Sequence, residues 1–145
     1  MTTSTIPTIK TALVTILTAL LPDPVWVGYG HPGTLRIDDM VAVMDARATQ
    51  VVGPMGSNRV RDETVTVEIT FSTYRGGNDQ PTTTARVFTM LGLLETSLRS
   101  DPTLGLGITL CRGAQVSDIA LAELAIPEGR VAEIAVTVTA ICRLN

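Results

Sequence analysis

The sequence predicts an α+β domain with two layers, in which helices pack against a sheet. Residues 64–71 read T-V-T-V-E-I-T-F, with apolar side chains at every second position. Because successive strand side chains point to opposite faces, this period predicts a sheet with one apolar and one polar face. Two segments with helical spacing of apolar residues bracket the strand region, and either could cover the apolar face. The predicted order is α-β-β-β-α-β-β.

Length and composition favour a single folded domain over residues 1–145. Hydrophobic residues make up 45% of the chain and charged residues 17%, which is typical of a globular protein with its own core. The net charge of -3 argues against a dedicated nucleic-acid-binding protein, which normally has a basic surface. The sequence has no long apolar span and no signal-peptide pattern at its start, so we expect no membrane partner and synthesis in the cytoplasm.

The first helix is predicted over residues 6–21. Thr5 can cap it, Pro7 is tolerated in its first turn, and Pro22 and Pro24 end it. Its apolar side chains recur at helical spacing: Ile6, Ile9, Leu13, Ile16, Leu17 and Leu20.

Turn residues divide the rest of the chain. The predicted strands cover five segments: 25–29, 40–52, 60–74, 106–126 and 130–144. A turn is predicted at 53–58, a loop at 75–81, and a bulge or break at Gly113. The second helix is predicted over 82–99, and it ends at Asp101-Pro102. Its predicted inner stripe consists of Val87, Phe88, Leu91, Leu94 and Leu98.

A glycine motif and a lone histidine are the first candidates for chemistry. Gly28, Gly30 and Gly33 match G-x-G-x-x-G, but Pro32 intervenes and no helical stripe follows. A dinucleotide site needs a helix there, so we interpret the segment as a turn-rich loop. His31 is interpreted as an exposed loop residue, with a general-base role as the alternative.

The acidic pairs and the cysteines give no clear site either. Asp38 with Asp39, and Asp62 with Glu63, would point to opposite faces of an extended strand, so we interpret them as solvated charge. Cys111 and Cys142 are predicted to be free thiols that could be neighbours, with a disulfide between them as the alternative. Two cysteines and one histidine show no zinc-ligand spacing. The sequence therefore predicts no catalytic, cofactor or metal site.

Charged residues beside two predicted turns are candidates for subunit contacts. They are either ordinary soluble surface or docking elements that match charges on a neighbour. The candidate interface residues are Arg59, Arg61, Asp62, Glu63, Arg75, Asn78 and Asp79.

The chain resembles the tail terminator proteins of long, non-contractile-tailed phages of the lambda type. The resemblance rests on the helix ending in Leu20-Leu21-Pro22, the strand from Thr64 to Phe71 that runs on to Tyr74, the second helix, and the final strand over 135–144. It covers nearly the whole chain and lies in the order and texture of the elements, without a signature motif. It implies a two-layer sandwich in which both helices lie on one face of a mixed, mostly antiparallel sheet.

The resemblance also implies a function. Such a protein is a structural component of the virion tail or neck, assembled in the host cytoplasm, and not an enzyme. It forms a homo-oligomeric ring of six subunits that caps the tail tube, stops polymerisation of the major tail tube protein, and joins the head completion or connector protein. DNA can pass through such a ring without sequence-specific binding. The alternatives are another connector or tube subunit of the same fold, or a small-molecule-binding domain or enzyme of unfamiliar chemistry.

Overall fold

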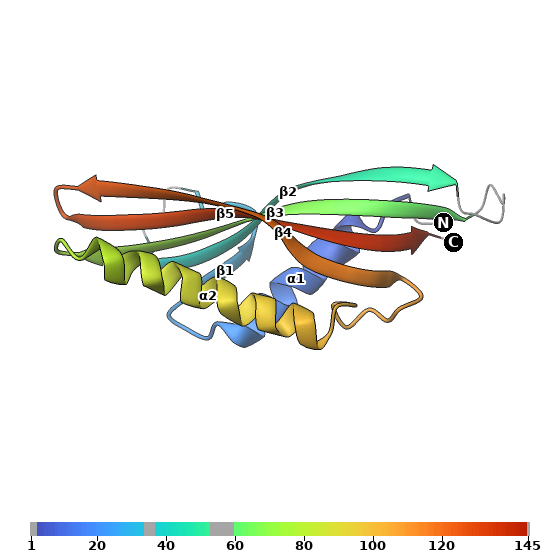
Figure 1. The fold of residues 1–145 in the computed structure, drawn as a ribbon, viewed down its shortest axis with the longest axis horizontal. Helices are drawn as coiled ribbons and strands as arrows, with labels where there is room; N and C mark the ends of the chain where they lie inside the picture. Colours follow the sequence, from blue (N-terminus) through green and yellow to red (C-terminus); the bar gives the residue numbers. More distant parts are fainter. Residues whose placement is uncertain (1–2, 34–36, 53–59, 145) are drawn as a thin grey trace.

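A computed structural model describes residues 3–33, 37–52 and 60–144, and its elements follow the predicted order (Figure 1). Within these residues there are two helices and five strands: α1 (Ile6–Leu20), β1 (Trp26–Tyr29), β2 (Asp39–Val52), β3 (Arg61–Gly76), α2 (Gln80–Ser100), β4 (Cys111–Ile126) and β5 (Gly129–Leu144). The predicted α+β class is confirmed.

The five strands form one sheet in the order β1-β2-β3-β5-β4. β1 runs parallel to β2, and all the other neighbouring pairs are antiparallel, so the predicted mixed, mostly antiparallel sheet is confirmed. The connection through α2 carries the chain from β3 past the position of β5 to β4, which forms one edge of the sheet.

Both helices lie on the same side of the sheet (Figure 1). α1 packs against β1 and β2, and α2 packs against β3, β4 and β5. On β3, the predicted inward side chains Val65, Val67, Ile69 and Phe71 are all fully buried in the core. The period of two in this strand therefore marks the face that the helices cover.

The other face of the sheet has no helix over it in the described part of the chain. Thr64 and Glu68 are exposed there, and Thr66 and Thr70 are half-buried. On β5, Thr137 and Thr139 pair with Glu68 and Thr66, so neutral hydroxyl side chains extend this polar face across two strands.

Several predicted boundaries are corrected. β3 continues through Arg75 and Gly76, and α2 begins at Gln80, so the predicted loop over 75–81 shrinks to a short connection. β4 begins at Cys111, because turns occupy most of the segment before it. The predicted turn at 53–58 lies outside the described residues.

Two details of the helices also differ from the prediction. Phe88 is 39% exposed, and Met90 takes its place in the buried stripe of α2. The Thr5 side chain makes no capping hydrogen bond; the Ser4 hydroxyl accepts the Ile6 N–H at 3.1 Å instead. The bulge expected at Gly113 is confirmed by a register shift between Cys111 and Gly113.

Neither α1 nor α2 has the combination of length and hydrophobicity that a membrane-spanning helix requires, and this holds for the described residues only.

Candidate functional site

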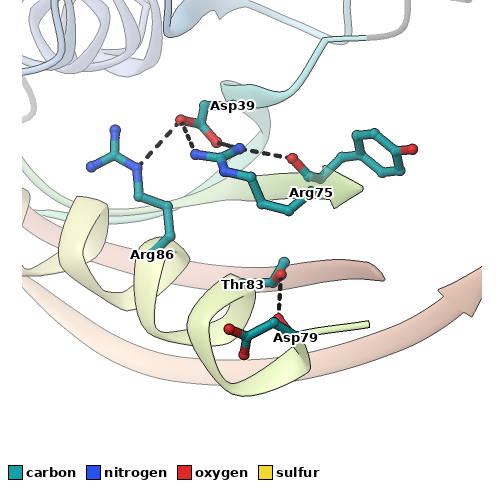
Figure 2. Close-up of polar contacts among 6 residues, drawn as sticks. Asp39, Arg75, Asp79, Thr83 and Arg86 are labelled. Carbon is teal, nitrogen blue, oxygen red and sulfur yellow. Dashed lines mark hydrogen bonds and ion pairs between the residues drawn. The ribbon is translucent and has the colours of Figure 1, made fainter. Parts of the chain in front are cut away.

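The most buried ion-pair cluster centres on Asp39 at the start of β2. Its side chain is 8% exposed and accepts two hydrogen bonds from Arg75, at 2.7 and 3.0 Å, and one from Arg86 Nε at 3.3 Å (Figure 2). Burial raises the pKa of Asp39, but the hydrogen bonds and charges of both arginines outweigh burial and hold it below its ordinary value. The interpretation of Asp39 as solvated charge is therefore wrong.

This cluster joins three elements that are distant in sequence. Arg75 ends β3 and Arg86 projects from α2, so the Asp39 carboxylate ties both to the start of β2. Figure 2 shows the two guanidinium groups converging on this carboxylate from different elements. The geometry is that of a structural clamp, because both Arg75 terminal nitrogens are already engaged with Asp39.

A second acidic residue is buried beside the first turn of α1. Glu63 is fully buried, and its carboxylate accepts the Thr5 N–H at 2.8 Å, the Thr5 hydroxyl, and the Gln50 amide at 2.7 Å. Burial raises the pKa of Glu63, but these hydrogen bonds lower it by more than burial raises it. The pKa therefore lies below its ordinary value. Glu63 is thus not solvated charge either, and it has no exposed surface with which to contact a partner.

The other predicted interface residues have mixed surroundings. Asp62 pairs with Arg143 at 3.1 Å, and Asp79 caps α2 by accepting the Thr82 N–H at 3.0 Å. Arg61 is half-buried at the start of β3, and Asn78 is exposed. Arg59 lies outside the described residues.

Residues that could carry out chemistry do not gather in the described part of the chain. Those residues contain no group of three histidine, cysteine, aspartate or glutamate side chains that could hold a metal ion. His31 is exposed, as predicted, and its Nδ1 accepts the Gly33 N–H at 2.9 Å. Gly28 lies under the Trp26 ring, where a Cβ atom would come within 2.2 Å of it, so close packing explains this glycine.

Cys111 and Cys142 are neighbours across β4 and β5, and both are buried free thiols, as predicted. The hydrogen bond between them lowers the pKa of Cys111 and, together with burial, raises that of Cys142. Burial makes these thiols poor nucleophiles for an external substrate.

The largest unexplained feature is the outer half of β4. From Ser117 to Ala125 every residue is exposed, although Ile119, Leu121 and Leu124 are large and apolar. Their exposed fractions are 43, 44 and 57%. Ile119 and Leu121 pair with buried Val136 and Ile134, so they point to the helix side, whereas Leu124 points to the polar side. The strand is thus apolar on both faces.

The same sheet has a second free edge, on β2, at the edge opposite β4. β1 pairs with β2 only over Met40–Val43, and Met44 and Asp45 lie in a register shift between β2 and β3. The free half of β2, from Ala46 to Val52, therefore has a neighbour on one side only. Val51 and Val52 are 58 and 51% exposed. The sequence predicts both strands but gives no signal for these edges, because apolar residues at both parities also fit a strand buried on both faces.

No protein-family model matches the chain, and no curated protein is similar enough to it to count as a match. The function proposed below therefore rests on the residues and their arrangement.

Proposed function

We propose that this protein works by assembly, as the tail terminator of a long, non-contractile-tailed phage. Copies of it form a closed ring, of six subunits by the resemblance, that docks on the end of the tail tube. The ring prevents further addition of tube subunits and presents a surface to the head connector. In this proposal the protein is a structural component of the virion and not an enzyme.

The observation that carries the proposal is the exposed apolar edge strand. Ile119, Leu121 and Leu124 are each about half in contact with water in the single chain. Soluble proteins usually shield sheet edges with charges, prolines or covering loops, because an open edge pairs with other chains. Ile119 and Leu121 are neighbours on the helix side of this strand, and exposed apolar neighbours of this kind are typical of a surface that another protein covers. This edge favours a protein whose working state contains more than one chain.

The two free edges also favour a ring. β4 and the free half of β2 lie at opposite edges of one sheet and differ in sequence. A contact between them therefore joins unlike surfaces. Such heterologous contacts repeat from copy to copy and form a ring where the rotation closes. A closed ring has a fixed number of subunits, which is the property that a tube cap needs.

The polar face of the sheet is compatible with this role. Thr66, Thr70, Thr137 and Thr139 are all half-buried, and Glu68 is the exposed charge beside them. Neutral hydroxyl groups can face either water or another protein at low cost, since they can donate and accept hydrogen bonds in both settings.

Copy number in the virion tests the proposal against its closest alternatives. Quantitative mass spectrometry of purified virions should find a small fixed number of copies per particle, equal to one ring. A tube subunit would be present in many stacked rings, and absence from the virion would exclude every structural role. Deleting the gene supplies the second test, because tails without a terminator should grow to uncontrolled lengths and stay unattached to heads.

A further inference from the structure

We infer that the outer half of β4 pairs antiparallel with the free half of β2 in a second copy of this chain, so that the sheet continues from subunit to subunit. This inference rests on the proposed assembly and identifies the surface and the partner. It follows from strand direction, side-chain size and charge at the two edges.

Strand direction permits this pairing. Across the sheet, β2, β3, β5 and β4 alternate in direction, because each neighbouring pair is antiparallel. β4 therefore runs opposite to β2. When a second copy continues the sheet in the same orientation, its β4 meets the first copy's β2 as an antiparallel neighbour, which is the pairing that shares the most regular hydrogen bonds.

Side-chain size on the helix side is complementary. β4 presents Ile119 and Leu121 there, whereas β2 presents the small residues Ala46 and Ala48, which pair with the buried Val67 and Val65 of β3. Large side chains from one edge can thus cover small ones on the other. The helices do not close this side completely, because both alanines remain only half-buried.

Phe88 of α2 extends the apolar surface beside β4. The Thr84 hydroxyl on α2 donates to the Glu123 carboxylate on β4, which places this part of the helix next to the strand. Phe88 follows Thr84 by four residues and so lies on the same side of the helix, one turn further along. Its 39% exposure adds an aromatic anchor to the side of the edge that faces the partner's alanines.

The charges at the two edges favour contact between unlike edges. The outer half of β4 carries Asp118 and Glu123 and no basic residue, whereas β2 beyond its pairing with β1 carries Asp45 and Arg47, so its charges balance. Arg47 is exposed and has no ion-pair partner among the described residues. Pairing β4 with β4 of another copy would instead bring four carboxylates to one seam, which disfavours a symmetric dimer.

The positions of the free segments impose an offset between copies. Ile119, Val136, Ile69 and Val43 are paired one after another across the sheet. The outer half of β4 is therefore at the end of the sheet where β1 pairs with β2. The free half of β2 is at the other end. Pairing the two therefore shifts each copy along the strand direction, and a stagger of this kind is what closing a sheet into a barrel requires.

Cysteine cross-linking of the full-length protein tests this pairing. Ala48→Cys is combined in one chain with Ile119→Cys, Leu121→Cys or Glu123→Cys, which all point to the helix side. The purified variants are concentrated and oxidised with copper-phenanthroline. At least one pair should yield a ladder of disulfide-linked multimers that ends at a closed ring. The matched control is Ala48→Cys with Ala120→Cys, because Ala120 points to the polar side and should give at least ten-fold less cross-linked product.

The possible results separate this inference from the proposed function. A ladder from a helix-side pair supports the seam, whatever the phenotype of the deletion strain. Normal tails in the deletion strain would remove the terminator role and leave the seam standing. Folded variants that stay monomeric under oxidation overturn the seam, as does a product that stops at dimers and also forms from Leu121→Cys without Ala48→Cys. The wild-type chain, whose two cysteines are buried, sets the background.

Discussion

The Glu63 carboxylate on β3 accepts the backbone N–H of Thr5 at 2.8 Å, although the two residues are far apart in sequence. This contact attaches the start of α1 to the sheet. Gln50 of β2 donates to the other carboxylate oxygen at 2.7 Å and to the Thr3 carbonyl at 2.8 Å, so one buried charge and one amide organise the N-terminal segment. Such a buried carboxylate is stable because each of its contacts is a hydrogen-bond donor.

Removing this carboxylate should destabilise the fold. Glu63→Ala leaves the Thr5 and Gln50 donors without their acceptor, and we expect a loss of about 2–3 kcal/mol in the free energy of unfolding. Urea denaturation followed by circular dichroism measures the change. Glu68→Ala is the matched control on the same strand, because Glu68 is exposed and should change stability by less than about 0.5 kcal/mol. Equal losses in the two variants would contradict the anchoring role.

Stability should fall in acid because of the same residue and Asp39. The pKa values of both carboxyls are lower in the folded chain than their ordinary values near 4. The unfolded state therefore binds protons first as the pH falls, so the stabilisation is complete above about pH 5 and is lost progressively below about pH 4. Denaturation midpoints measured from pH 7 to pH 3 should show this fall. Glu63→Gln should flatten it, and an unchanged pH profile in that variant would be inconsistent with the depressed pKa.

The Asp39 clamp should contribute less than its geometry suggests. The Arg75 and Arg86 side chains are 40 and 35% exposed, so water screens their attraction to Asp39. We expect Arg86→Gln to cost about 0.5–1 kcal/mol, and Asp39→Asn to cost more, because that change leaves two arginines facing each other without a counter-charge. Thermal melts of the two variants measure the difference, and the reverse ranking would argue against Asp39 as the centre of the cluster.

The two faces of β3 should respond differently to truncation. Phe71 is fully buried, and Phe71→Ala should cost about 3–5 kcal/mol in the free energy of unfolding. Thr70→Ala, on the polar face, should cost less than about 1 kcal/mol. Denaturant unfolding of both purified variants provides the comparison. Similar losses would mean that both faces of the sheet are covered in the isolated chain.

Periodicity predicted most of the fold because each pattern has one physical cause. The alternation from Val65 to Phe71 reflects a strand covered on one side, and the structure places those side chains in the core. Helical spacing wrongly predicts Phe88 in the buried stripe of α2, because Phe88 lies next to the buried Val87 at the margin of that stripe. Helical spacing alone does not decide which margin the sheet covers.

The charged residues were the least predictable part. Asp39 and Glu63 each have an acidic neighbour in sequence, and such a pair of carboxylates is typical of a solvent-exposed segment. Their burial depends on Arg75, Arg86, Thr5 and Gln50, which come from other elements. Local sequence carries no signal for such partners. The open edge of β4 has no local signal either, because the order of strands in the sheet decides which strand lies outermost.

The predicted docking role of Arg59 and Arg61 remains a prediction. Arg61 has no ion-pair partner among the described residues, so reversing both arginines to glutamate should leave the melting temperature within about 2 °C of the wild type. The double variant should assemble poorly, because like charges would face each other at a contact. Full complementation of a deletion phage by this variant would show that the two arginines are ordinary surface.

Tail length in a phage that lacks this gene tests the central claim most directly. Electron micrographs of the deletion lysate should show tails with a broad length distribution, unattached to heads. Wild-type protein supplied in trans should restore one length. Leu121→Arg places a charge on the exposed edge of β4; because Leu121 is exposed, the variant should fold, but it should not restore tail length. A deletion lysate with normal, head-attached tails of uniform length would contradict the account.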